Sequence, residues 1–346
     1  MITRRSLLTL PALPRILAPA GQAGPLSGAF RWAASRPLVA PLDRDGDHYY
    51  SVKDPSIVRH NGRWHLFCTV RGKLRSHQIE SFTFPDWDHA ARAERRMMKL
   101  SDGYFCAPQV FHFRPHKKWY VVYQVIDKSR EPALQPAYST TADLSDPFSW
   151  TPPRLLFASH PEGVKMWIDF WVICDERKAH LFFTSLDGKM WRAETRLAGF
   201  PAGWDRPRVV LEGDIYEASH TYRLKGSRQY LTVVEAQGQG GRRYYKAYTA
   251  STLDGAWTPL ADTPERPFAS PANVKFESSP WTESFSHGEL LRDGSDETLT
   301  VDPNNLQFLF QGVMDRDRKG KPYGEIPWRL GLLKSGTVSV PPVPGR

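Results

Sequence analysis

The chain of 346 residues contains only three cysteines, Cys68, Cys106 and Cys174, and they lie far apart. No Cys-x-x-Cys pair and no Cys/His spacing typical of zinc accompanies them, which excludes the common structural zinc sites. Each cysteine lies within an apolar, strand-like segment. We therefore predict buried structural thiols, with a single disulfide as the alternative in an oxidising compartment.

Long apolar runs and dense basic runs are also absent. Beyond the N-terminus, no segment approaches the roughly 20 apolar residues of a membrane helix, so we expect no membrane contact. The net charge is +9, yet no run of lysine and arginine exceeds three residues. Because nucleic-acid-binding proteins gather such residues in a stripe, we expect a solvated basic surface and no nucleic-acid partner. Attraction to polysaccharides that bear uronic acids is a milder alternative.

Sustained helical periodicity is missing as well, except around Asp88 to Lys99. Instead, 29 prolines and 25 glycines divide the chain at short intervals, and 12 % of the residues are aromatic. This composition favours many short strands joined by turns over a helical bundle.

The N-terminal segment has the features of an export signal. The pair Arg4 and Arg5 precedes a mildly apolar stretch that ends in small residues near Ala23, as in a twin-arginine leader. One arginine and three prolines interrupt the stretch, so a disordered basic tail is the alternative. We predict a signal over residues 1–23, a secreted or periplasmic protein, and one catalytic domain over residues 24–346.

A repeat organises the rest of the chain. Five segments share a small or polar residue, an apolar strand, a turn and a second apolar strand. They begin at Asp54, Ala107, Asp169, Glu217 and His287, in steps of 48 to 70 residues. Steps of this size fit a blade of about four strands, so we predict an all-β, five-bladed β-propeller. A pair of β-sandwiches and a β-helix are the alternatives.

A propeller would turn these repeat positions into neighbours, because its innermost strands converge on one axis. Asp54, Asp169, Glu217 and His287 would then form a ring of three carboxylates and an imidazole. Taken singly, each acid is more commonly a turn or cap residue, and the histidine a core residue bonded to the backbone. Crowded like charges raise one another's pKa, so their occurrence at one register in three blades favours a functional site.

Two carboxyl groups in unequal environments are the requirement of glycoside hydrolysis. Lys53 beside Asp54 favours the ionised carboxylate, which suits a general base. Glu217 follows the aromatic Tyr216, and an apolar flank would keep it protonated as a general acid. Asp169 would orient that acid or raise its pKa by repulsion. His287, on the axis, is either a core histidine or a ligand of a cation held mostly by water.

Seven motifs carry a family resemblance. They are Lys-Asp-Pro-Ser-Ile-Val at 53–58, Ala-Pro-Gln-Val-Phe at 107–111, Trp-Ile-Asp at 167–169, Tyr-Glu-Ala at 216–218, Phe-Ser-His-Gly-Glu at 285–289, Asn-Leu-Gln-Phe-Leu-Phe-Gln-Gly at 305–312 and Pro-Trp-Arg-Leu-Gly-Leu-Leu at 327–333. In this order, from about Phe30 to Leu333, the chain resembles glycoside hydrolase family 62. That family consists of five-bladed propellers, inverting α-L-arabinofuranosidases related to family 43, which release side groups from arabinoxylan and often arabinan.

The resemblance implies roles for six residues and a plant polysaccharide as partner. The implied roles are general base for Asp54, general acid for Glu217, a third acid that tunes it for Asp169, a central structural calcium at His287, and a sugar pocket lined by Lys53 and Tyr323. We expect a monomer with no organic cofactor.

The chain departs from the family pattern near the substrate. Family members usually have tryptophan after the Tyr-Gln of the second blade, where this chain has Val125 followed by an apparent insertion over residues 126–135. Gly324 replaces an asparagine found in many members. Two alternatives therefore stay open: a family 43-like enzyme acting on β-xylosides or other furanosides, and a non-catalytic propeller that binds glycans.

Overall fold

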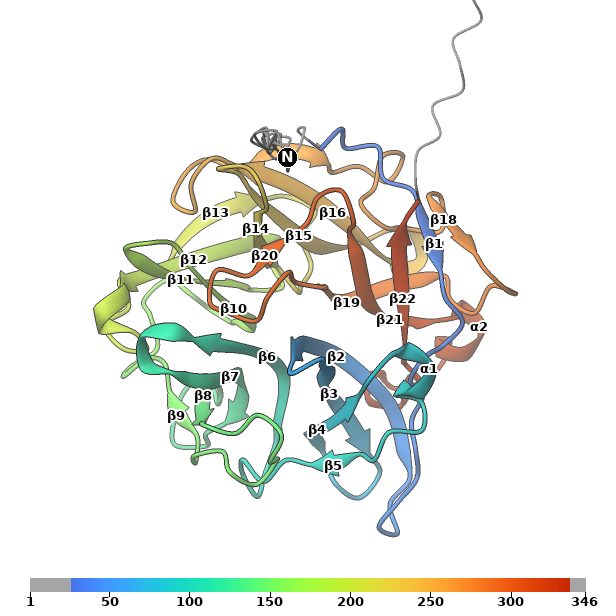
Figure 1. Ribbon diagram of the computed structural model, residues 1–346, viewed down its shortest axis with the longest axis horizontal. Helices are drawn as coiled ribbons and strands as arrows, with labels where there is room; N and C mark the ends of the chain where they lie inside the picture. The colour runs from blue at the N-terminus through green and yellow to red at the C-terminus, as the bar shows by residue number, and fades with distance from the viewer. Residues whose placement is uncertain (1–25, 337–346) are drawn as a thin grey trace, which may run out of the picture.

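The computed structural model describes residues 26–336, so the expected export signal over residues 1–23 lies outside the described residues. In the described part, 22 strands form five separate sheets around one axis, which confirms the predicted five-bladed propeller (Figure 1). The expected helix near residues 88–99 is only a single turn, α1 (Trp87–Ala90), and β5 (Arg96–Met97) occupies the end of that range. No helix among residues 26–336 is long and apolar enough to cross a membrane.

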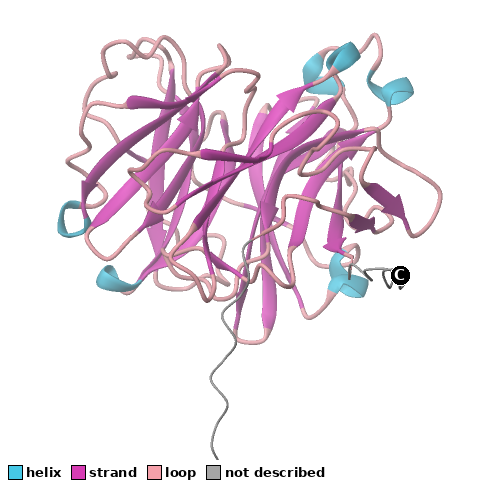
Figure 2. Ribbon diagram, turned by 90° about the horizontal axis from the view of Figure 1, so that it is seen from above, coloured by secondary structure: helices cyan, strands magenta, loops and turns pink. Residues whose placement is uncertain are grey.

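Three blades are built from consecutive strands. Blade 1 contains β2 (Tyr49–His60), β3 (Arg63–Gly72), β4 (His77–Phe84) and β5; blade 2 contains β6 (Phe105–Phe113), β7 (Lys118–Ile126), β8 (Leu134–Thr141) and β9 (Arg154–Leu155); blade 3 contains β10 (Ile168–Cys174), β11 (Lys178–Thr184), β12 (Lys189–Arg196) and β13 (Arg208–Glu212). In each blade the first strand is innermost, and Figure 2 shows the strands running between the two faces of the disc.

The last two blades include strands from elsewhere in the chain. Blade 4 contains β14 (His220–Leu224), β15 (Tyr230–Gln237), β16 (Arg243–Ala250) and β17 (Thr258–Ala261), with β20 (Thr300–Val301) on its inner edge; blade 5 contains β19 (Ser284–Leu290), β21 (Gln307–Val313), β22 (Arg329–Ser335), β1 (Trp32–Ala34) and β18 (Val274–Phe276). The N-terminal β1 pairs antiparallel with the C-terminal β22, so the two ends of the described chain close the ring together.

The innermost strands are buried on both sides between neighbouring blades, which explains their nearly continuous apolar sequences. Large aromatic side chains fill the spaces between blades; Trp167 and Trp171 are among the largest that are fully buried. Cys68, Cys106 and Cys174 are buried and free, which confirms the predicted thiols and excludes the disulfide.

In four blades, the residue at the same place on the inner side of the blade has a left-handed backbone conformation. Asp54, Ala107, Asp169 and Ala218 all have positive φ angles, between 49° and 58°. In the first three blades the pairing register slips at this residue, so one extra residue is inserted. Left-handed conformations of residues other than glycine are strained and cluster at functional sites.

The bulges connect each blade to the one before it, because the backbone N–H that leaves the ladder donates to a neighbouring side chain. The bonds run from Asp54 N to Gln311 Oε1 (2.7 Å), from Ala107 N to Thr69 Oγ1 (2.8 Å), from Asp169 N to Gln124 Oε1 (2.7 Å) and, in blade 5, from His287 N to Glu235 Oε2 (2.8 Å). The ring of inner strands is therefore fixed by one polar side chain from each neighbouring blade.

The repeat was misaligned by one residue in blade 4. Ala218, not Glu217, occupies the left-handed position, so Glu217 corresponds to Lys53 and Cys106 rather than to Asp54. An alignment by residue type pairs the acid Glu217 with the acid Asp54. The positive φ angle pairs Ala218 with Asp54 instead. As a consequence, Glu217 approaches the axis from a different position of its blade than the two aspartates do.

Candidate active site

Asp54, Asp169 and His287 meet at the axis, although more than 100 residues separate each from the next. The His287 Nδ1 atom lies 3.4 Å from Asp54 Oδ1 and 3.6 Å from Asp169 Oδ2. All three residues are at most 6 % exposed. Two carboxyl groups thus share one imidazole ring in a largely water-free setting.

Glu217 completes the group from blade 4. Its Oε1 atom lies 3.4 Å from Arg243 Nη1, and the same Nη1 lies 2.6 Å from Glu235 Oε1. The guanidinium also stacks 3.8 Å from the centre of the Tyr216 ring. Glu217 is 5 % exposed and Glu235 is fully buried, so one arginine is shared between two buried carboxylates.

The environment of Asp54 favours its ionised form. Burial alone raises the pKa of this carboxyl, but the neighbouring side chains of His287 and Lys53 and the hydroxyl of Thr69 outweigh burial and hold it below its usual value. Lys53 is itself 5 % exposed and adjacent in sequence. A carboxylate of this kind is ready to accept a proton.

Glu217 and Asp169 have the opposite character. Burial, followed by the negative charges of Glu235 and Asp169, raises the pKa of Glu217 well above its usual value, against the pull of Arg243. Burial also raises the pKa of Asp169 to about 6. Asp169 Oδ2 accepts a hydrogen bond of 3.0 Å from the N–H of Ala218, the residue after Glu217. Asp169 is therefore hydrogen-bonded to the backbone next to the protonated Glu217.

Lys53 and Tyr323, the two residues expected to line the sugar pocket, contact each other. The Lys53 Nζ atom lies 4.7 Å from the centre of the Tyr323 ring. The tyrosine is 47 % exposed, yet burial of its hydroxyl end and the charges of Glu217 and Asp54 raise its pKa well above the usual value. Tyr323 thus has an open ring face and a hydroxyl directed towards the carboxylates.

Gly324, which follows this tyrosine, lies beside Arg71. A Cβ atom at position 324 would lie 3.3 Å from Arg71 Nε, closer than most such contacts. A side chain here would therefore require the Arg71 side chain to shift by a few tenths of an ångström. The replacement of asparagine by Gly324 is thus accompanied by the nearby Arg71 of blade 1.

In the second blade, Val125 stands at the position where the sequence pattern of the family has tryptophan, and the nearby Cys106 contributes a thiol to the site. Val125 is 6 % exposed and pairs with Phe105, so it offers little surface. Cys106, at the register of Lys53 and Glu217, donates a hydrogen bond to Tyr104 Oη (3.0 Å) and accepts one from Gln124 Nε2 (3.2 Å). Burial raises the pKa of this cysteine to about 12, so it is a neutral thiol.

The residues around His287 offer few ligands for a cation. No group of three or more His, Cys, Asp or Glu side chains within residues 26–336 is arranged to hold a metal ion. Nδ1 of His287 faces the two aspartates, which leaves Nε2 as the ring atom available to a cation. The residues present therefore fit only an ion that keeps most of its water ligands.

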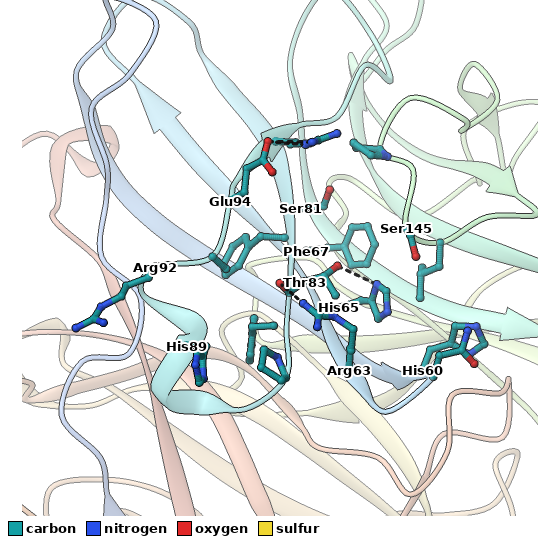
Figure 3. A pocket seen from close by; sticks show the side chains of 18 residues that line it. His60, Arg63, His65, Phe67, Ser81, Thr83, His89, Arg92, Glu94 and Ser145 are labelled. Carbon is teal, nitrogen blue, oxygen red and sulfur yellow. Dashed lines mark hydrogen bonds and ion pairs between the residues drawn. The ribbon is translucent and has the colours of Figure 1, made fainter.

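A separate cavity of about 610 Å³ lies between blades 1 and 2, and Figure 3 shows its lining. It includes His60, Arg63 and His65 from the turn where the inner strand of blade 1 ends. Asp169 instead lies at the start of β10, and Glu217 lies just before β14 begins. This cavity therefore belongs to the opposite face of the propeller and contains none of the three carboxylates.

A propeller that holds one ionised and one protonated carboxyl group close to its axis has the two groups that a glycoside hydrolase requires. The sequence comparison specifies the family: the model of glycosyl hydrolase family 62 matches residues 31–334. The chain belongs to glycosyl hydrolase family 62.

Its relatives agree with this assignment. It is 39 % identical over 317 residues to α-L-arabinofuranosidase C of Cellvibrio japonicus, covering 89 % of this chain and 48 % of that protein. The chain thus spans about half the length of the curated relative. The catalytic domain of a family 62 α-L-arabinofuranosidase from Coprinopsis cinerea has a TM-score of 0.84 and 37 % identity, covering 90 % of this chain and 98 % of that chain. An α-L-arabinofuranosidase from Podospora anserina, solved with cellotriose, has a TM-score of 0.83 and 36 % identity, with the same coverage of both chains.

The sequence analysis missed Glu235 and Arg243. Glu235 lies within the apolar run Leu231 to Ala236, and a lone carboxylate in a buried strand is the signal that identifies it. It also accepts a hydrogen bond of 2.9 Å from Ser286 Oγ. Glu235 therefore joins blades 4 and 5 while it holds the arginine beside Glu217.

We expect Glu235→Gln to lower the pKa of Glu217, because one negative charge is removed and Arg243 is left to stabilise the Glu217 carboxylate. The alkaline limb of the activity profile should move down by about one pH unit. The measurement is kcat/KM against pH. Glu283→Gln, which alters the neighbouring exposed pair with Arg242, is the matched control. An unchanged limb in folded Glu235→Gln contradicts this positioning role.

Proposed function

We propose that this protein is an inverting, exo-acting α-L-arabinofuranosidase that removes arabinofuranosyl side groups from arabinoxylan or arabinan. The observation that carries the proposal is the opposite pKa shift of two buried carboxyl groups, downward at Asp54 and upward at Glu217. The names of the family 62 relatives support the sugar.

In the proposed reaction, Glu217 gives its proton to the glycosidic oxygen while the bond from that oxygen to the anomeric carbon breaks. Asp54 takes a proton from a water molecule whose oxygen bonds to the same carbon from the opposite face. The sugar is released with inverted configuration. Asp54 then loses its proton to solvent, and Glu217 regains one.

The surrounding residues prepare these two groups. Lys53 and His287 keep Asp54 ionised, and Asp169 and Glu235 keep Glu217 protonated. Lys53 and Tyr323 form a wall against which a single terminal sugar is oriented. Because the carboxylates are almost completely buried, a side group fits the pocket and a main chain does not, which supports exo-action.

The direct test is product analysis. Proton NMR should show β-L-arabinofuranose as the first product from an α-L-arabinofuranoside, before mutarotation. Release of xylose from xylo-oligosaccharides would instead favour the family 43-like alternative, to which Val125 and the insertion point. Binding of arabinoxylan with no released sugar would favour a non-catalytic glycan-binding propeller.

The pH dependence should be bell-shaped. The acid limb should lie below the usual pKa of an aspartate, because Asp54 must be ionised and its pKa is lowered. The alkaline limb should lie well above the usual pKa of a glutamate, because Glu217 must be protonated and its pKa is raised by burial and by the charges of Glu235 and Asp169. Asp169→Asn removes a repelling charge, so the alkaline limb should fall; a rise would contradict the assignment. The measurement is kcat/KM from acid to alkaline pH.

Three expectations complete the proposal. We propose secretion or a periplasmic location from the signal-like residues 1–23, and a monomeric state. A calcium ion, if present, would have His287 as its protein ligand and would supply positive charge near Asp54 and Asp169. Isothermal titration with calcium, compared between the native protein and His287→Ala, tests that ligand.

A further inference from the structure

The cavity of about 610 Å³ between blades 1 and 2 lies on the face opposite the carboxylates, at the turn from β2 to β3. Four segments line it: this turn with the start of β3, the end of β4, the residues between α1 and β5, and the loop after β8. Pockets of about 300–1,000 Å³ hold small molecules, so the cavity has room for a sugar ring.

Arginines dominate the charge of this cavity. Arg63, Arg92 and Arg96 line it together with a single acidic residue, Glu94. The Arg96 Nη2 atom lies 2.9 Å from Glu94 Oε1, so this acid compensates Arg96. Among residues 26–336, neither Arg63 nor Arg92 forms an ion pair with a carboxylate. The lining therefore has an excess of positive charge.

Arg63 is the cation best placed to hold a ligand. Figure 3 shows it beside His65 and Thr83 in the middle of the cavity, whereas Arg92 lies at the edge. Among the described residues, the Arg63 guanidinium donates only to the Thr83 carbonyl, at 3.5 Å, which is a long hydrogen bond. Burial lowers the pKa of His65 to about 4, so the neighbouring imidazole is neutral. Arg63 therefore supplies the positive charge at this point and has donors to spare.

The rest of the lining suits a sugar ring. Phe67 and Leu144, both almost fully buried, contribute apolar surface at the base of the cavity. Ser81 and Ser145 contribute hydroxyl groups (Figure 3). A pyranose has C–H groups on its faces and hydroxyl groups at its edge, so it matches both kinds of surface.

We propose that this cavity is a second carbohydrate site, which binds a uronic-acid side group of a polysaccharide by pairing its carboxylate with Arg63. The planar guanidinium can donate two parallel N–H···O bonds to a carboxylate. An inorganic anion would make no use of the apolar base, and an acidic protein surface is too large for the cavity. The net charge of +9 attracts such a polyanion from a distance.

This site would hold the polymer on the face away from the active site. Any gain in activity from that retention rests on the proposed function, but the binding itself does not. The two can therefore fail separately, because binding is measured without turnover.

The test compares glucuronoxylan with the same polymer after its carboxyl groups have been reduced to alcohols. Affinity electrophoresis in gels that contain each polymer measures the binding. We expect the native protein to bind the carboxylate form about tenfold more tightly, and Arg63→Gln to remove this preference. Arg63 is exposed in a turn, so the variant should fold and keep its activity on 4-nitrophenyl α-L-arabinofuranoside.

Arg177→Gln is the matched control, because it removes an exposed arginine from the corresponding turn of blade 3, outside the cavity. It should keep the preference for the carboxylate form. An equal loss in Arg177→Gln and Arg63→Gln would indicate attraction to the whole basic face and overturn the site.

Competition identifies the ligand. Free glucuronate should weaken binding of glucuronoxylan by the native protein, and inorganic phosphate at the same ionic strength should not. Equal competition by both would indicate a general anion site and overturn the assignment to a sugar. Equal binding of the native protein to the two polymers would overturn the proposal altogether.

Discussion

Replacement of Glu217 by glutamine is expected to lower kcat on arabinoxylan by about 10²–10⁴-fold, the usual contribution of a general acid. Glutamine keeps the shape of the side chain but has no proton to give to the glycosidic oxygen. The loss should be much smaller on 4-nitrophenyl α-L-arabinofuranoside, because nitrophenolate leaves without being protonated. The measurement is kcat on both substrates.

This contrast between leaving groups identifies the acid. A residue that only binds sugar would reduce both activities equally. Glu212→Gln, on the outer strand β13, replaces the same residue type at an exposed position and should leave both activities unchanged. A folded Glu217→Gln variant with native activity on arabinoxylan would eliminate the proposed mechanism.

Replacement of Asp54 by alanine is expected to abolish hydrolysis of both substrates, with a loss of about 10²–10⁴-fold or more, because no group remains to activate water. The missing side chain also leaves space for a small anion. Azide should restore cleavage of the aryl substrate and give β-L-arabinofuranosyl azide, in which azide nitrogen has replaced the nitrophenolate on the opposite face. The configuration of the azide is measured by NMR.

Asp54→Asn is the natural comparison, since its amide fills the space and should prevent rescue. An azide product with the α configuration would indicate attack on a covalent intermediate and thus a retaining mechanism. Full activity of a folded Asp54→Ala variant without any added anion would mean that Asp54 is not the base.

Most of this arrangement was predictable because the chain repeats itself. Asp54 and Asp169 occupy equivalent positions on inner strands, and a radial fold brings equivalent positions together whatever their distance in sequence. The inner and second strands were recognisable as apolar runs separated by turns. The blade boundaries followed from their spacing.

Other features depend on information that residue types do not contain. The one-residue offset at Glu217 follows from the positive φ of Ala218, which is an alanine like many others in the sequence. Arg243 lies on the third strand of blade 4 and reaches Glu217 through its long side chain. Such a contact has no periodic signature, because it crosses between strands.

The closure of blade 5 makes the order of events during folding important. β1 can complete its pairing only after β22 has been synthesised, since Trp32 pairs with Val274 on one side and with Ser335, near the far end of the chain, on the other. Contacts this distant in sequence slow folding and leave strand edges exposed in intermediates. The pocket is assembled from blades 1, 3, 4 and 5, so partly made chains should be inactive and prone to aggregate. The active site is therefore complete only after β22 has paired with β1.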